Sequence, residues 1–259
     1  MMLKDFFAHP LTRGMDLDDP RTTYLRRQII KEKPFLRRIY EQWYQSLAAA
    51  LPDRIEPVLE IGSGAGFLKT FIADLITSEI FFCPDVKVVL DAAQLPFRDG
   101  SLRGVVMTDV LHHLPKPRDF FAEAARCVCR GGMMAMIEPW VTPWSRIIYR
   151  YLHHEPFRPQ SDEWEFPSNG PLSGANMAMP WMIFERDRKT FEHEFPDWKI
   201  QSIVPFMPFS YLVSGGVATR SLVPETAFPL MRSLEERMQP VLKSWAMFAQ
   251  IRLQRTGKY

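Results

Sequence analysis

Cysteine is scarce in this 259-residue chain, which contains only Cys83, Cys127 and Cys129. Three thiols are too few for a disulfide framework. The Cys-x-Cys pair at 127 and 129 has no second pair of ligands beside it, so it lacks the ligand set of a structural zinc site. We therefore expect three buried thiols.

The chain also lacks an excess of charge of one sign and any long apolar run. Its formal net charge is +2, far from the strongly basic balance of most nucleic-acid-binding proteins, so we expect no nucleic-acid partner. No stretch approaches the ~18 apolar residues that a membrane span needs. The first residues lack the apolar segment of a secretory signal. We therefore predict a cytoplasmic protein without a membrane span.

Apolar residues make up 46% of the chain and aromatic residues 13%. This composition is sufficient for the core of one large α/β domain or two small ones. A strand-like stretch at 57–61 leads into three alternating glycines, Gly62, Gly64 and Gly66. Glycine lets the backbone bend sharply and approach a ligand closely.

The glycine pattern departs from the dinucleotide-binding fingerprint in two ways. Phe67 stands where the third glycine would be, and an acid, Glu60, precedes the loop. A carboxylate at this position suits a cationic ligand better than a pyrophosphate, because opposite charges attract. S-adenosylmethionine is such a ligand, since it carries an ammonium and a sulfonium group.

Residues 58–66 resemble the first motif of class I S-adenosylmethionine-dependent methyltransferases, V-L-E/D-x-G-x-G-x-G. Residues 91–101 resemble the segment after the third strand in the small-molecule branch that includes quinone-biosynthesis enzymes, methyltransferase type 11. Residues 105–114 resemble the fourth strand and the following turn. The motifs occur in family order over residues 57–138. The resemblance implies S-adenosylmethionine as cofactor and S-adenosylhomocysteine as product.

The resemblance also implies a Rossmann-like, doubly wound α/β fold, with a seven-stranded, mostly parallel sheet and an antiparallel last strand. We predict four regions. They are an N-terminal arm and helical cap (1–56), a cofactor-binding core (57–138), a lid inserted after the fifth strand (139–184) and the C-terminal part of the same domain (185–259).

Apolar periodicity predicts two helices between Thr22 and Leu51, divided by Pro34, with Leu36, Ile39, Trp43 and Leu47 on one face. The other predicted helices span 67–75, 117–128, 186–194 and 224–243. The predicted strands after the first span 76–82, 86–90, 104–108, 133–137, 198–204 and 246–255. A parallel crossover normally needs about a dozen residues. Because only residues 83–85 separate the second and third strands, either the second ends early, near Ile80, or one of the two is misplaced.

The resemblance assigns cofactor contacts along the core. The glycine loop would hold the methionine end, Asp91 and the Ala92 amide the adenine, and Glu79 the ribose hydroxyls. Alternatively, Glu79 is an ordinary strand-end acid and Asp85 takes its role. The full set of predicted contacts is Glu60, Gly62, Ser63, Gly64, Gly66, Glu79, Asp91, Ala92, Thr108 and Asp109.

The segment 138–180 is irregular and rich in proline and tryptophan. Long irregular segments in enzymes are usually functional, and the family holds the methyl acceptor at this edge of the sheet. Two adjacent histidine pairs, 112–113 and 153–154, lie near or within it. Because neighbours in a chain point in different directions, we expect at most one of each pair to face a pocket.

The predicted catalytic or acceptor-binding residues are His113, His154 and Glu155. A histidine can take a proton at neutral pH, and Glu155 would orient it or bind the acceptor. Alternatively, the histidines cap a turn or pack in the core. A His-His-Glu metal site is a further alternative, but no third ligand at regular spacing is evident, so we predict no metal.

Six cations within residues 26–38 would attract an anionic acceptor or a membrane surface, or they form a solvated helix face. The apolar segment 206–216 belongs to the core or lines an apolar acceptor site. The partner predicted from these features is a small-molecule acceptor of apolar or anionic character.

The predicted function is methyl transfer to a small molecule, with oxygen, nitrogen and carbon acceptors all open, as is the oligomeric state. The Asn/Asp-Pro-Pro-Tyr/Phe set of amino-directed methyltransferases is missing after the fourth strand, so we do not expect methylation of DNA bases or glutamine. One alternative is a non-catalytic S-adenosylmethionine-binding module. The other is an NAD(P)-dependent oxidoreductase, against which Glu60 and Phe67 argue.

Overall fold

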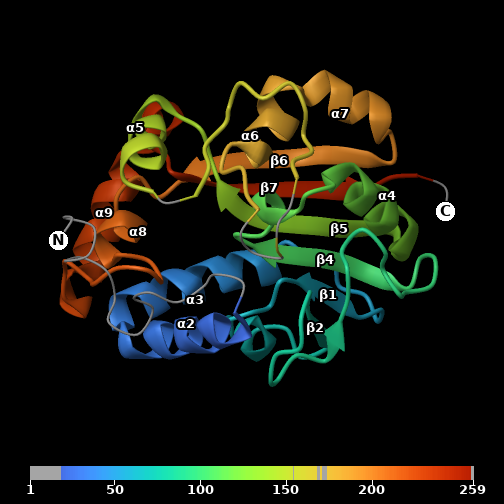
Figure 1. Cartoon of the computed structure of the whole chain (residues 1–259), viewed down its shortest axis with the longest axis horizontal. Helices are drawn as coiled ribbons and strands as arrows, with labels where there is room; N and C mark the ends of the chain where they lie inside the picture. The colour runs from blue at the N-terminus through green and yellow to red at the C-terminus, as the bar shows by residue number, and fades with distance from the viewer. Residues whose placement is uncertain (1–18, 154, 168–169, 171–173, 258–259) are drawn as a thin grey trace.

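A seven-stranded sheet with the strand order β3-β2-β1-β4-β5-β7-β6 runs through the molecule (Figure 1). The computed structural model describes residues 19–153, 155–167, 170 and 174–257. The strands are β1 (Val58–Ile61), β2 (Leu75–Glu79), β3 (Val88–Val89), β4 (Leu102–Thr108), β5 (Val128–Pro139), β6 (Trp198–Phe206) and β7 (Phe248–Arg255). Strands β1 to β5 pair in parallel, and β7 is antiparallel to both β5 and β6. This order confirms the predicted Rossmann-like sheet with an antiparallel last strand.

Helices cover both faces of the sheet. They are α2 (Pro20–Glu32), α3 (Pro34–Ala48), α4 (Pro117–Cys127), α5 (Pro143–Tyr151), α6 (Met179–Trp181), α7 (Arg188–Glu194), α8 (Ser210–Ser214), α9 (Phe228–Arg237) and α10 (Leu242–Trp245). Shorter turns are η1 (Leu68–Thr70), η2 (Leu111–His113), η3 (Met182–Arg186), η4 (Glu225–Ala227) and η5 (Gln239–Val241). Several helices begin with proline, whose missing N–H costs nothing in the first turn.

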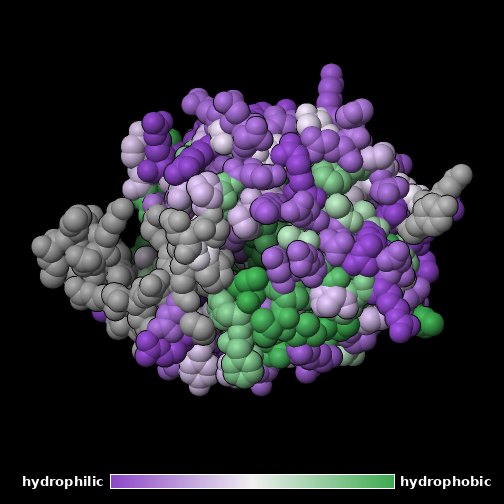
Figure 2. All heavy atoms as spheres, turned by 45° about the vertical axis from the view of Figure 1, so that its right-hand side comes forward, coloured by the Kyte–Doolittle hydropathy of each residue, from purple (hydrophilic) through white to green (hydrophobic). Residues whose placement is uncertain are grey.

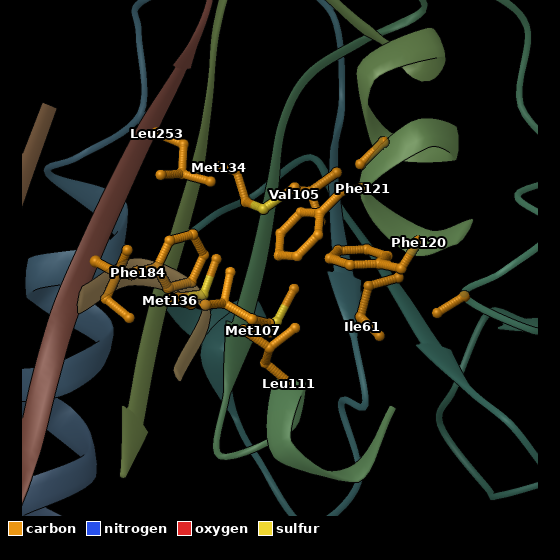
Figure 3. Close-up of a cluster of buried hydrophobic side chains, with 14 of the residues drawn as sticks. Ile61, Val105, Met107, Leu111, Phe120, Phe121, Met134, Met136, Phe184 and Leu253 are labelled. Carbon is orange, nitrogen blue, oxygen red and sulfur yellow. The ribbon is translucent and has the colours of Figure 1, made fainter. Parts of the chain in front are cut away.

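One face of the sheet packs against α4 and the segment that leads into α7. Figure 3 shows side chains of β1, β4, β5 and β7 pointing toward Phe120 and Phe121 of α4 and toward Phe184 of η3. The Phe121 ring lies 5.1–5.8 Å from four other phenylalanine rings, two of which, Phe191 and Phe195, lie in or next to α7. This aromatic cluster fills the space that the apolar sheet face would otherwise expose to water.

The opposite face packs against α3. The four residues predicted to share one face of this helix are all buried there, against side chains of β1, β4 and β5. The predicted division of the N-terminal helices at Pro34 is also confirmed, because α2 ends at Glu32 and α3 begins at Pro34. All three cysteines are buried and free, as expected. Residues 1–18, which contain most of the predicted arm, lie outside the described residues.

The connections on either side of β2 differ from the prediction. The helix predicted at 67–75 is wrong, since only the turn η1 forms there. Strand β2 ends at Glu79 instead of residue 82, which confirms the alternative that the second strand ends early, near Ile80. The predicted third strand is reduced to β3. Part of the reason is that α3 already covers this half of the sheet. Its Tyr44 ring packs 4.9 Å from Phe67, next to η1, which leaves little apolar surface for a crossover helix.

The C-terminal helix predicted at 224–243 is broken into η4, α9, η5 and α10. Pro240 interrupts it because proline has no N–H to donate to the preceding turn. The other predicted elements after β3 are present with shifted ends. The largest shift is in β5, which begins at Val128, before the predicted start at residue 133.

The edge of the sheet at β2 and β3 exposes apolar side chains. Ile80, Phe82 and Val89 are 43%, 78% and 52% exposed. Figure 2 shows apolar side chains gathered on the lower part of this side of the molecule. Among the described residues, no helix has the length and apolar character to cross a membrane.

We predict that Phe121→Ala lowers the free energy of unfolding by about 3–5 kcal/mol, because it leaves a cavity inside a fully packed aromatic cluster. Chemical denaturation measures this change. The matched control is Phe82→Ala, which removes an exposed ring and should change stability by less than about 0.5 kcal/mol. Equal losses in the two variants would contradict the packing described here.

Candidate functional site

The glycine loop between β1 and η1 is shaped by close contacts that leave no room for side chains. Gly62 and Gly64 have φ angles of +65° and +34°, in the left-handed region that favours glycine. A Cβ atom on Gly62 would lie 2.6 Å from Val110 Cγ2, and one on Gly64 would lie 3.0 Å from Glu79 Oε1. The loop therefore touches both the end of β2 and the turn that follows β4.

Two serines tie this loop to β2. The Ser63 N–H donates to the Ser78 carbonyl at 2.8 Å, and the Ser78 N–H donates to Ser63 Oγ at 3.0 Å. The Ser78 hydroxyl donates in turn to the Glu60 carbonyl at 2.6 Å. Ser63 thus donates through its N–H and accepts on Oγ from the same residue of β2, and these two contacts position the loop.

Two carboxylates, Glu60 at the end of β1 and Glu79 at the end of β2, are buried next to the loop. The pKa of Glu60 is raised to about 7, mainly by burial and in smaller part by the neighbouring Glu79, against the opposing effects of Ser63 and Arg27. Burial also raises the pKa of Glu79, although the Ile80 N–H donates to its Oε2 at 3.1 Å. Two acids that resist ionisation side by side form a site that a cation would stabilise.

Helix α2 lies over the same loop. Arg27 donates through Nη2 to the Gly64 carbonyl at 3.1 Å and through Nη1 to Asp85 at 2.7 Å. Arg26 is half-buried, and its charge acts on both Glu79 and Asp109. The part of the chain that the structure describes shows no hydrogen bond or ion pair for Arg26. These two cations therefore face the loop, whereas Arg37 pairs with Glu41 on the exposed side of α3.

The predicted adenine contacts follow β3 at the same edge of the sheet. The Asp91 side chain is exposed and accepts a hydrogen bond from the Ala93 N–H at 2.9 Å, whereas Ala92 is buried. The short hydrogen-bonded turn at Asp91 leaves its carboxylate at the surface. Adenine recognition by these residues stays a prediction.

The end of β4 carries the most unusual backbone of the site. Asp109 has a φ of +61°, although it is not glycine, and its N–H donates to the Ile137 carbonyl at 2.8 Å. Burial raises the pKa of Asp109 to about 7. The adjacent Thr108 Oγ1 is buried without a hydrogen-bond partner among the described residues. Strained backbone of this kind is concentrated at functional sites.

A buried acid fixes the turn after β4. Glu138, at the end of β5, is fully buried and accepts the N–H groups of Val110 and Leu111 on Oε1, both at 2.8 Å. Its other oxygen, Oε2, lies 2.9 Å from His112 Nδ1. The turn η2 is therefore held by three polar contacts to one carboxylate.

Glu155, from the segment that follows α5, lies above both histidines of this turn. His112 Nε2 is 3.4 Å from Glu155 Oε2, and His113 Nε2 is 3.7 Å from Glu155 Oε1. The two rings lie side by side, 4.2 Å apart, and reach the same carboxylate, although His112 is 1% exposed and His113 15%. The expectation that at most one of the pair faces a pocket stays a prediction. His154 lies outside the described residues.

The charges within this group depend on one another. Burial alone would lower the pKa of His112, but its hydrogen bond with Glu138 and the nearby Glu155 carboxylate raise that pKa well above its usual value. Burial and the charge of His112 lower the pKa of His113 to about 4. Burial alone would raise the pKa of Glu155, but the adjacent histidines lower it. His113 is therefore neutral at pH 7, next to an ionised Glu155.

Sequence reasoning missed His112 and Glu138. It chose His113 because only one of two neighbours was expected to face a pocket, and it treated Glu138 as the boundary of a strand. The available signal was an acid at the end of a central apolar strand, since a fully buried acid needs polar partners. The structure brings together His113 and Glu155, two of the three predicted catalytic residues, and adds these two.

Comparisons with known proteins match part of the sequence to a family model and the fold to solved structures. Residues 59–136 match a family model described as a methyltransferase domain. The fold matches a chain of the complex between the Haloferax volcanii Trm112 methyltransferase activator and a methyltransferase, with 12% identity and a TM-score of 0.53, over 94% of this chain and 99% of that chain. It also matches geranyl diphosphate C-methyltransferase from Streptomyces coelicolor A3(2), solved with Mg²⁺, geranyl diphosphate and S-adenosyl-L-homocysteine, with 14% identity and a TM-score of 0.50, over 96% and 92%. No curated protein matches the sequence.

We predict that Gly64→Val abolishes binding of S-adenosylhomocysteine in a protein that still folds. Valine strains a backbone with positive φ, and its Cβ meets Glu79 Oε1. Calorimetry measures the binding. Gly100→Val is the matched control, because Gly100 also has a positive φ, +61°, but lies outside the loop. Unchanged affinity in folded Gly64→Val would rule out the loop as the cofactor site.

We also predict that S-adenosylhomocysteine binds about tenfold more tightly at pH 8 than at pH 6. Glu60 is protonated below its pKa of about 7, and the ammonium group of the ligand favours the ionised form, so affinity rises as the pH rises through 7. The charged and titratable groups that face Glu60 are Glu79, Arg27 and Tyr44.

The control for this pH dependence is Glu60→Gln, which should bind more weakly and with little change between pH 6 and pH 8. Titrations of both proteins at several pH values provide the comparison. An equally steep dependence in Glu60→Gln would assign the effect to another group.

Proposed function

We propose that this chain, an S-adenosylmethionine-dependent methyltransferase with the class I fold, methylates a small-molecule acceptor bound beside His113 and Glu155. The observation that carries the proposal is the place of these side chains. They meet at the turn after β4, whose Val110 packs against Gly62 of the cofactor loop. An acceptor bound there would lie next to the methyl group of the cofactor.

The reaction needs little covalent help from the protein, because the sulfonium of the cofactor already activates the methyl group. The acceptor atom attacks the methyl carbon with its lone pair, the S–CH₃ bond breaks, and its electrons return to sulfur to give S-adenosylhomocysteine. An acceptor hydroxyl or amine must also lose a proton. Neutral His113 and ionised Glu155 are placed to receive that proton or to orient the acceptor.

The surroundings of this position are mainly aromatic. Tyr40 and Tyr149 are buried and Tyr211 is half-buried. All three have raised pKa values, first because of burial and also because of the Asp109 carboxylate, so their hydroxyls stay neutral. The Trp43 ring stacks on Tyr211 at 5.5 Å. Such walls suit an apolar or aromatic acceptor with a few polar atoms.

Arg26 gives the site one cation without an ion-pair partner among the described residues. It lies on α2, above a loop that we assign to the amino-acid end of the cofactor, and its charge acts on Glu79 and Asp109. We assign it to the carboxylate of the cofactor, with Glu60 facing the ammonium. In this arrangement α2 closes over the cofactor and excludes water.

We predict that His113→Ala and Glu155→Ala keep an affinity for S-adenosylhomocysteine close to that of the unmodified protein but lose about 10²-fold or more in methyl transfer. Methyl-labelled cofactor and a panel of hydroxylated and amino small molecules provide the assay. His193→Ala is the matched control, since His193 is exposed on α7.

Unchanged turnover in both variants would contradict the proposed acceptor position. Binding of cofactor with no labelled product from any acceptor would favour the alternative of a non-catalytic S-adenosylmethionine-binding module.

A further inference from the structure

We propose that His112, His113 and Glu155 form a binding site for one divalent transition-metal ion of the Zn²⁺ type. One ligand atom from each residue can be chosen so that all three lie within 4.8 Å of one another. The two histidines come from the turn after β4, and Glu155 comes from the segment after α5. The fold thus supplies the third ligand that the local sequence spacing does not show.

The tautomers of both histidines follow from their partners. His113 Nδ1 lies 3.1 Å from the Gly174 carbonyl, which can only accept, so this nitrogen carries the proton. His112 Nδ1 donates in the same way to Glu138 Oε2 at 2.9 Å. His113 Nε2 therefore presents a lone pair, and His112 Nε2 presents one when a metal ion displaces its proton.

Both Nε2 atoms lie near the Glu155 carboxylate, at 3.4 Å for His112 and 3.7 Å for His113. His112 is only 1% exposed, and among the described residues its buried Nε2 atom forms no hydrogen bond. Two imidazole nitrogens and one carboxylate are therefore within reach of a single cation. A cation between them would balance the charge of the buried carboxylate and bind both nitrogens.

A metal ion satisfies this group more completely than a proton does. A proton on His112 Nε2 serves one contact and leaves His113 Nε2 facing Glu155 without a donor. A tetrahedral ion with bonds of about 2.0–2.1 Å holds its ligand atoms about 3.3–3.4 Å apart. The two Nε2 atoms lie 3.4 Å and 3.7 Å from the Glu155 oxygens, and the chosen ligand atoms all lie within 4.8 Å of one another, so the three side chains move closer together to reach that geometry.

The surroundings of the histidines also match a metal site. A histidine ligand commonly donates its other ring N–H to a carboxylate or a backbone carbonyl, which fixes the ring and strengthens the ligand. Glu138 plays this part for His112, and Gly174 plays it for His113. Two imidazoles and one carboxylate favour Zn²⁺, Co²⁺ or Fe²⁺ over Mg²⁺ and Ca²⁺, which prefer oxygen ligands.

Three protein ligands leave a coordination position open. If the proposed methyl transfer holds, that position faces the acceptor and would select a molecule with an oxygen or nitrogen donor near the methylated atom. This role rests on the proposed function. Binding of the ion itself does not, so metal binding and methyl transfer are tested separately.

The experiment uses the full chain after treatment with a chelator, without acceptor. Titration with Zn²⁺ in a calorimeter and with Co²⁺ by visible absorption should each give one equivalent per chain. His113→Gln and Glu155→Gln should lose this binding. Glu138→Gln should weaken it about 10–100-fold, the usual effect of losing a carboxylate behind a histidine ligand. His193→Gln is the matched control and should bind like the unmodified protein.

Binding of S-adenosylhomocysteine by each variant shows that it is folded. If His113→Gln fails this control, Glu155→Gln decides the result, since its side chain is partly exposed at the edge of the group. No stoichiometric binding, or binding that survives both ligand substitutions, would overturn the proposal and leave a proton on His112 as the bridging cation. Stoichiometric metal binding without methyl transfer would uphold the metal site and count against the proposed function alone.

Discussion

The buried carboxylate of Glu138 is the contact on which the geometry of the site depends. It belongs to the central strand β5 and binds two N–H groups and one imidazole of the turn after β4. A fully buried acid is costly unless its oxygens are satisfied, and here the turn supplies every partner. This turn then packs Val110 against Gly62 and presents two histidines to Glu155, so one side chain links the sheet, the glycine loop and the segment after α5.

Electrostatics divide the site into two parts. Around the glycine loop, buried or half-buried acids with raised pKa values lie near the cations of α2. A ligand with an ammonium and a carboxylate group would pair with both kinds of charge. Around η2, an ionised Glu155 faces two imidazoles whose pKa values are shifted in opposite directions. Titratable groups with shifted pKa values are concentrated at functional sites, because burial and neighbouring charges act on them together there.

The N-terminal helices cover a part of the sheet that crossover helices cover in a doubly wound fold with longer connections. The connections on either side of β2 contain only the turn η1 among the described elements, and α3 covers that half of the sheet (Figure 1). The same arrangement lays α2 across the loop and brings Arg27 to the Gly64 carbonyl. The helices that cover the sheet in place of crossover helices thus also bring α2 over the glycine loop.

The sequence by itself determined the features that depend on local patterns. Glycines at 62 and 64 allow the sharp, left-handed turn of the loop. Pro34 divides two helices, and the spacing of Leu36 and Trp43 gives α3 a buried face. These parts were predictable. The sequence could not show that η1 replaces a helix, because whether apolar residues form a helix depends on what already covers the sheet. Only the tertiary structure decided the partners of Glu138 and the meeting of Glu155 with both histidines. These residues are distant in the chain, and long-range contacts between buried polar groups follow from packing, which no local pattern records.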